Sequence, residues 1–269
     1  MEYKWIKNIA DISDDYTSII FFRNFNEIIR LNSLPENLTS LTFGYYFNQK
    51  IGPNSLPKNL ISLTFGYLFN QKIGINSLPK NLTTLKFGDD FNQKIKQNIL
   101  PIYLTTLTFG YDFNQKIDPN RLPENLTSLI FGNDFNQKLE PNSLPDNLTS
   151  LTFGRKFNQK IDLEILPYNL KYINFYWIFT NDDIISPKYI DMVNNIPRYY
   201  DVKIVLKKNI FDVDGPIWPI YVLYYYEEEW SSEIYDIIDK YDDPFYGSIT
   251  ILINKETYQP YSLAKSALK

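Results

Sequence analysis

Cysteine and histidine are both absent from this 269-residue sequence. Without cysteine, the chain has no disulfide framework and no thiolate nucleophile. Without histidine, it lacks the usual general base and the commonest protein metal ligand. The sequence also contains no Ser/His/Asp set, no phosphate-binding glycine loop and no dinucleotide fingerprint. We therefore expect a protein that is not an enzyme and that uses no cofactor and no metal.

Long apolar runs and a strong net charge are missing as well. The longest apolar run, 217–226, contains Pro219 and is too short to cross a bilayer. The first residues lack the apolar core of a signal peptide. A net charge of −4 argues against a nucleic-acid binder, which needs a basic face. These absences predict an intracellular, cytoplasmic monomer that binds neither nucleic acid nor membrane.

The dominant feature of the sequence is a 22-residue unit that recurs without gaps. Each unit opens on a Leu-Pro step, at positions 34, 56, 78, 100, 122, 144 and 166. A fixed period of this length is typical of a solenoid, in which every unit buries its apolar face against its neighbours. The fold class we predict is a repeat solenoid.

Inside a unit, Leu41 and Phe43 alternate with Ser40 and Thr42, which is the pattern of a half-buried strand. Stacked units then form a parallel β-sheet of about eight coils, joined by mostly irregular return segments. Gly44 and its copies are expected at a bend that needs positive φ or close backbone approach. The side chains expected to point inward and to stack on their copies are Leu38, Leu41, Phe43, Phe47 and Ile51.

Two rows of asparagine also recur, beginning at Asn48 and Asn54. They could form a polar ligand stripe. Asparagine side chains commonly bond neighbouring backbone in turns, however, and stacked bends need their backbone groups satisfied. We therefore interpret both rows as structural.

Both ends of the chain depart from the repeat. Residues 1–33 contain a degenerate first unit without the Leu-Pro step or the glycine, and they are interpreted as an N-terminal cap. The regular repeats occupy 34–183. Residues 184–269 lose the period and are expected to form a C-terminal α+β cap. The elements expected there are a helix at 187–195, a helix ending near 241, and strands at 200–206, 217–226 and 248–253.

The conserved frame of the unit is formed, in its first full copy, by Leu34-Pro35, Leu38-Thr39, Leu41, Phe43-Gly44, Phe47-Asn48-Gln49 and Ile51. This pattern resembles the FNIP repeat of social amoebae and of giant viruses of amoebae, which is similar in turn to the leucine-rich repeat. The resemblance covers residues 12–183. It implies a leucine-rich-repeat-like arc, a role in protein interaction and, for a viral protein, a location in the host cytoplasm.

Two positions vary inside this frame, between the glycine and the second phenylalanine of each unit. They lie where the strand leaves the concave face, and exposed tyrosine and arginine are preferred interface residues. The alternative is drift at unconstrained positions. The candidate protein-binding residues are Tyr45, Tyr46, Tyr67, Leu68, Asp89, Asp90, Tyr111, Asp112, Asp134, Arg155 and Lys156.

The function we predict is a non-enzymatic scaffold that binds a protein partner of unknown identity through the concave face and strand-exit edge. One alternative is an adaptor that recruits substrates to host ubiquitin ligase machinery, because FNIP repeats of viral relatives often follow an F-box. A second alternative is a surface-binding or structural stack, in which the hydroxyls at Ser40, Thr42 and their copies would contact a regular surface.

Overall fold

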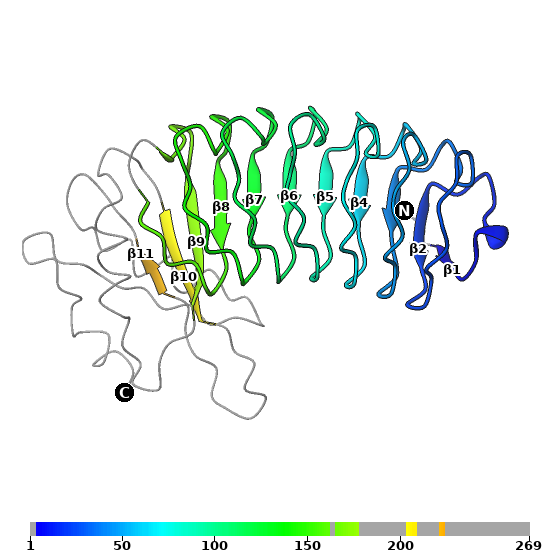
Figure 1. Cartoon of the computed structure of the whole chain (residues 1–269), viewed down its shortest axis with the longest axis horizontal. Coiled ribbons are helices and arrows are strands. Elements are labelled where there is room, and N and C mark those ends of the chain that lie inside the picture. Colours follow the sequence, from blue (N-terminus) through cyan, green and yellow to red (C-terminus); the bar gives the residue numbers. More distant parts are fainter. Residues whose placement is uncertain (1–3, 162–164, 178–202, 209–220, 224–269) are drawn as a thin grey trace, which may run out of the picture.

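The computed structural model describes residues 4–161, 165–177, 203–208 and 221–223, which form an elongated stack of coils with one short strand per coil (Figure 1). Within these residues, the sheet contains eleven strands that follow one another in sequence order. They are β1 (Lys4–Ile6), β2 (Ser18–Phe21), β3 (Ser40–Thr42), β4 (Ser62–Thr64), β5 (Thr84–Lys86), β6 (Thr106–Thr108), β7 (Ser128–Ile130), β8 (Ser150–Phe153), β9 (Tyr172–Trp177), β10 (Lys203–Lys208) and β11 (Tyr221–Leu223).

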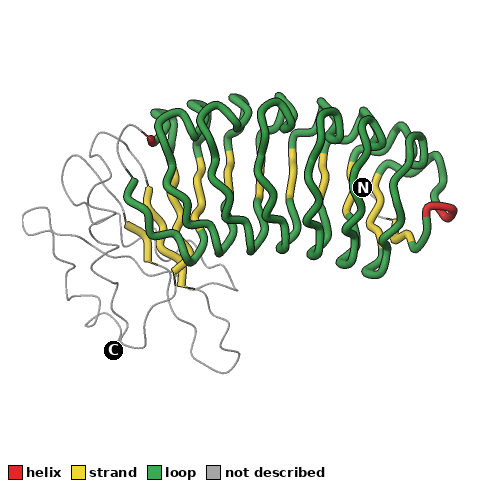
Figure 2. The backbone as a smooth tube through the Cα atoms, in the orientation of Figure 1, coloured by secondary structure: helices red, strands yellow, loops and turns green. Residues whose placement is uncertain are grey.

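The repeat sets the register between neighbouring coils. Leu41 in β3 lies opposite Leu63 in β4, and the 22-residue offset continues to Ile173 in β9. A short 3-10 helix, η1 (Ile9–Asp11), precedes β2. Between β2 and β8 the connecting segments consist of turns and irregular backbone (Figure 2). The prediction of a parallel solenoid with irregular return segments is therefore confirmed.

The core is built from the predicted ladders of leucine, isoleucine and phenylalanine. Phe43, Phe47 and the other inward side chains of the first full unit are at most 3% exposed. The two phenylalanines of one coil stack face to face, as Phe87 and Phe91 do with ring centroids 3.9 Å apart. Phe87 also stacks on Phe109 of the next coil at 5.7 Å. Each buried phenylalanine or leucine contributes on the order of 1.5–3 kcal/mol to stability.

The first asparagine row links neighbouring coils. The Oδ1 atom of Asn70 accepts a hydrogen bond from the backbone N–H of Asn92 at 3.0 Å and another from Nε2 of Gln93 at 2.8 Å. The second row acts through its backbone, since Asn54 and Asn76 have φ of 56° and 58°. Asparagine tolerates this left-handed region better than most residues. The structural interpretation of the two rows fits this geometry.

The prediction for the repeated glycine is half right. No glycine of the described residues has positive φ, so that part of the expectation is wrong. Close approach is the reason for the glycine: a Cβ added to Gly88 would collide with the carbonyl oxygen of Gly66 in the preceding coil. The left-handed conformation lies instead at the asparagines of the opposite bend.

The sheet continues at both ends of the regular repeats. β1 pairs in parallel with β2 and so adds a strand before the degenerate first unit. β10 pairs in parallel with β9 and overlaps the strand expected at 200–206, although it ends two residues later. β11 pairs antiparallel with β10 and lies within the strand expected at 217–226. The helices expected at 187–195 and near 241, and the strand expected at 248–253, lie outside the described residues.

Candidate functional site

Strands β2 to β8 each leave the sheet through the same tight turn. In the first full unit, the N–H of Phe47 donates to the carbonyl of Gly44 at 3.1 Å, which places Tyr45 and Tyr46 at the corner. The next corner is bonded to this one, because the N–H of Leu68 donates to the carbonyl of Tyr45 at 3.0 Å. Equivalent bonds join the later corners. The strand-exit edge, as we define it, consists of residues 45–46, 67–68, 89–90, 111–112, 133–134 and 155–156.

Aromatic rings gather at the first two corners of this edge. The ring of Tyr45 stacks on that of Tyr67, with centroids 4.7 Å apart and an interplanar angle of 11°. Tyr46 packs edge-on against Tyr45 at 5.0 Å. Tyr45, Tyr46 and Tyr67 are nevertheless 36%, 42% and 42% exposed. The contacts between the three rings hold them in place, and part of each ring remains accessible to another molecule.

Arg23 adjoins the first corner of this edge, although it is not among the residues predicted from the sequence. Its guanidinium carbon lies 4.7 Å from the ring centroid of Tyr45 and 5.5 Å from that of Tyr46. Both distances are within the range of a cation–π interaction. Arg23 precedes Tyr45 by one period of 22 residues, so the degenerate first unit contained the signal that could have identified it.

Carboxylates dominate the middle of the edge. Asp89, Asp90, Asp112 and Asp134 come from three consecutive coils. Burial raises the pKa of the Asp90 carboxyl, and the carboxylates of Asp112 and Asp89 raise it further. Partial burial and, after it, the charge of Asp89 raise the pKa of the Tyr67 hydroxyl. These shifts indicate a locally negative potential between Tyr67 and Asp134.

The last corner of the edge is basic. The Nζ atom of Lys156 lies 2.9 Å from a carboxylate oxygen of Asp134 in the preceding coil. The hydrogen bond to Asp134 is the main reason that the pKa of Lys156 is raised. The edge thus changes from aromatic to acidic to basic along the stack, as the sequence order of the corners requires.

All eleven candidate residues from the sequence lie on this one edge, in register. They differ in accessibility. Six are exposed: Tyr45, Tyr46, Tyr67, Tyr111, Asp112 and Lys156. Five are half-buried: Leu68, Asp89, Asp90, Asp134 and Arg155. Their role in binding stays a prediction.

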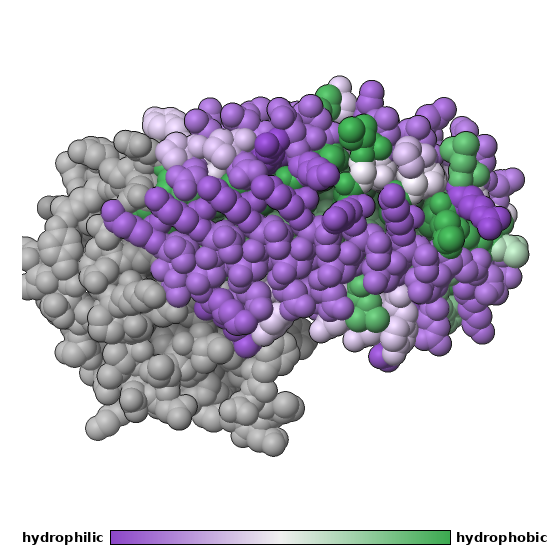
Figure 3. All heavy atoms as spheres, in the orientation of Figure 1, coloured by the Kyte–Doolittle hydropathy of each residue, from purple (hydrophilic) through white to green (hydrophobic). Residues whose placement is uncertain are grey.

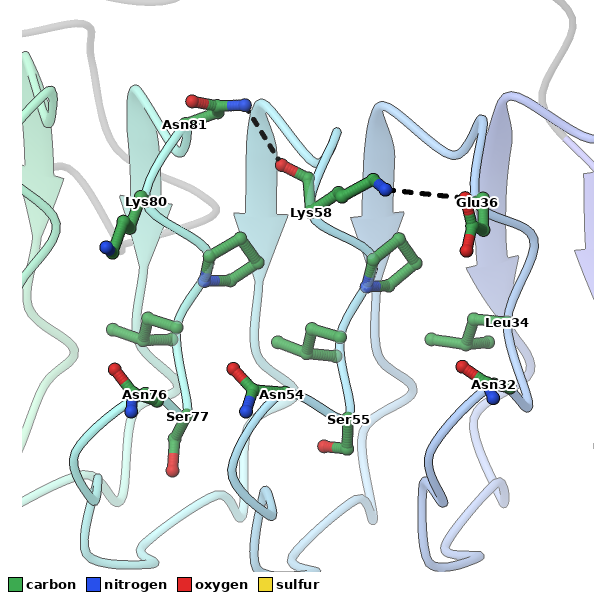
Figure 4. A pocket seen from close by; sticks show the side chains of 14 residues that line it. Asn32, Leu34, Glu36, Asn54, Ser55, Lys58, Asn76, Ser77, Lys80 and Asn81 are labelled. Atoms are coloured by element: carbon green, nitrogen blue, oxygen red, sulfur yellow. Dashed lines mark hydrogen bonds and ion pairs between the residues drawn. The ribbon is translucent and has the colours of Figure 1, made fainter.

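A separate groove crosses three coils at the bend that carries the Leu-Pro step (Figure 4). It has a volume of about 480 Å³, and Asn32, Asn54 and Asn76 form one row along it. At its rim, Nζ of Lys58 lies 3.7 Å from a carboxylate oxygen of Glu36. Its lining contains the Leu-Pro steps and the second asparagine row, and it includes none of the strand-exit edge. At its rim the charge varies between coils, from Glu36 to Lys58 and Lys80.

The face seen in Figure 3 is hydrophilic over most of the stack, with hydrophobic patches concentrated toward the N-terminal coils. No group of three acidic side chains in the described part of the chain is placed to hold a metal ion. Among the same residues, no helix has the length and apolar character needed to cross a membrane.

Comparison with known proteins identifies the repeat. The FNIP repeat family matches residues 25–68, 69–112 and 113–156, which are three consecutive pairs of coils. No curated protein matches the sequence. The FNIP resemblance seen in the sequence is confirmed.

A solved structure extends the comparison to the fold. The crystal structure of CroV588, from the giant virus CroV and described as a novel circular LRR protein, matches with 49% sequence identity and a TM-score of 0.60. The match covers 64% of this chain and 26% of CroV588, so the chain spans about a quarter of that protein. The similarity establishes a leucine-rich-repeat-like solenoid.

Proposed function

Because residues 25–156 of the chain are FNIP repeats on a leucine-rich-repeat-like solenoid, we propose that it is a non-enzymatic protein-interaction scaffold. The partner docks on the strand-exit edge. Solenoids of this kind present extended surfaces to partners, and residues on a rigid frame are well suited to binding.

The observation that carries the proposal is the exposed tyrosine row on an otherwise buried frame. Phe43 and Phe47, on either side of the first corner, are almost completely buried, whereas Tyr45 and Tyr46 between them are not. Tyrosine is enriched at interfaces because it buries a large area and loses few rotamers on binding. Because Tyr45 already stacks on Tyr67, part of the side-chain conformational entropy is lost on folding and does not have to be lost when a partner binds.

The test replaces Tyr45, Tyr67 and Tyr111 together with alanine. These side chains are 36%, 42% and 43% exposed, so the thermal unfolding temperature should change little while capture of the partner falls at least tenfold. Affinity purification from source cells with quantitative mass spectrometry measures the capture. Unfolding followed by circular dichroism measures the stability.

A matched control replaces three exposed isoleucines away from the edge: Ile61, Ile75 and Ile102. They are 47%, 70% and 61% exposed, so their removal lowers surface hydrophobicity without touching the edge. The control should retain the partner. Equal loss in both variants, or full capture by the tyrosine variant, would contradict docking at the edge. Ubiquitin ligase subunits recovered with the partner would support the narrower adaptor role.

A further inference from the structure

Among the described residues, no basic side chain forms an ion pair with the carboxylates in the middle of the strand-exit edge. The ion pairs of the described residues, such as Lys94 with Asp118 and Lys156 with Asp134, do not include Asp89, Asp90 or Asp112. Neighbouring coils bring these groups to about 4.8 Å per step along the sheet, well within one Debye length of each other. Burial and, after it, the negative charges of Asp112 and Asp89 raise the pKa of the Asp90 carboxyl. Like charges held this close favour the binding of a positively charged group beside them.

The chain's own cations bind to the two ends of the same edge. At the first corners, the guanidinium of Arg23 lies over the rings of Tyr45 and Tyr46. At the last corner, Lys156 lies 2.9 Å from Asp134. In both places a basic side chain from the adjacent coil contacts an aromatic ring or a carboxylate of the edge. The central corners have the same two acceptor types, and no cation of the described residues stacks on their rings or pairs with their carboxylates.

We propose that the central edge, from Tyr67 to Asp112, binds a partner segment that carries two or more arginine or lysine side chains. This inference rests on the proposed function and specifies the chemistry of the partner. One cation would lie against the exposed rings of Tyr67 or Tyr111, as Arg23 lies against Tyr45. A second would pair with the carboxylates of Asp89, Asp90 and Asp112, as Lys156 pairs with Asp134.

The spacing of the edge suits a polypeptide. Alternate residues of an extended segment lie about 6.6–7 Å apart and point to the same side. This separation falls between one and two coil steps of the edge, so alternating basic residues can each reach a different corner. Arginine fits better than lysine, because its planar guanidinium pairs bidentately with carboxylates and stacks on aromatic rings.

The experiment uses a fluorescein-labelled synthetic peptide of alternating glycine and arginine, and the same peptide with glutamine in place of arginine. Fluorescence anisotropy at physiological salt measures the dissociation constant for the full chain. The site variant carries Asp89→Asn, Asp90→Asn and Asp112→Asn, which keep side-chain shape and relieve like-charge repulsion. We expect it to bind the arginine peptide at least tenfold more weakly, and the glutamine peptide should not bind.

A control variant carries Glu36→Gln, Glu124→Gln and Asp146→Asn, three exposed acidic residues outside the edge. It changes the net charge by the same amount and should bind within twofold of the natural sequence. Equal weakening in both variants would show that attraction is only a property of net charge. Unchanged binding by the site variant would also overturn the inference.

A second variant, Tyr67→Leu with Tyr111→Leu, tests the aromatic half of the site. Loss of the two rings should weaken the peptide about fivefold to tenfold while the carboxylates remain. The outcome can be separated from failure of the proposed function. If the tyrosine row is needed to capture the natural partner but the carboxylates have no effect on the arginine peptide, the edge is an interface for a partner that is not basic.

Discussion

At Gly88 the backbone of one coil lies directly against the backbone of the coil before it. An added Cβ would collide with the carbonyl oxygen of Gly66 and would lie 2.9 Å from that of Tyr67. Both obstacles are backbone atoms held by the sheet, so neither can move aside without disturbing a coil. Gly52 lies at a different position of the repeat, near the end of the unit 34–55, and only Ser55 atoms are near its added Cβ, at 3.8 Å.

Replacing Gly88 with alanine should therefore lower the free energy of unfolding by about 1–3 kcal/mol, the usual cost of overpacking. The matched change Gly52→Ala should be neutral or stabilising by up to about 1 kcal/mol, because alanine restricts the unfolded chain and fits the folded one. Denaturant unfolding of the two variants measures the difference. Equal stability of both would show that close approach is not why the repeat contains this glycine.

The left-handed backbone of the repeat lies at Asn54 and Asn76, and the residues around them in the sequence do not predict it. Glycine is the usual residue for left-handed backbone, so positive φ is one of the two reasons that the sequence offers for Gly44, beside close approach. The real requirement at Gly44 comes from the neighbouring coil, whose distance cannot be read from one unit. The sequence predicts that the asparagines lie in turns, but it does not predict their positive φ.

At the scale of strands and ladders, most of the architecture follows from the sequence. The alternation around Leu41 and Phe43 predicts each short strand, and the constant period predicts parallel pairing in register. β1 was not predicted, because residues 4–6 show no match to the repeat and pair only through the edge that β2 leaves open. The constant period also predicts that the corner residues lie together on one edge. The stacking of Tyr45 on Tyr67 and the cation of Arg23 depend on side-chain geometry and were not.

The paired phenylalanine ladders make a further prediction about stability. Phe91 is completely buried and stacks on Phe87 at 3.9 Å and on Phe69 and Phe113 at 6.1 Å. Replacing it with alanine should cost about 3–5 kcal/mol, since it leaves a cavity shared by three coils. Tyr67→Ala is the control from the preceding coil, and its cost should be about 1 kcal/mol or less because the ring is 42% exposed. Urea unfolding measures both variants. Equal losses of stability would contradict the view that the phenylalanine ladder stabilises the fold and the strand-exit edge does not.

For the molecule as a whole, the stack behaves as a one-dimensional array whose coils contact only their neighbours. Stability in such an array is close to a sum of coil terms and interface terms. The edge extends this logic to binding, because each coil adds one corner and the order of corners sets the order of aromatic, acidic and basic groups. Adding or removing one coil should therefore change the free energy of unfolding by one coil term and one interface term. It should also add or remove one corner of the strand-exit edge.

Deleting one complete unit, residues 78–99, tests this directly. Ser77 would then precede Leu100-Pro101, so the frame of leucine, phenylalanine and asparagine ladders stays in register. We expect a folded protein whose circular dichroism spectrum keeps its shape and whose unfolding temperature falls by a few degrees, because one inter-coil interface is lost. Deleting only residues 78–88 is the control, since half a unit places polar turn residues where the ladders need apolar ones. That variant should lose cooperative unfolding altogether. If the whole-unit deletion lost cooperative unfolding as the half-unit deletion does, the description of the stack as an array of equivalent coils would be wrong. The strand-exit edge could then not be treated as a series of independent corners.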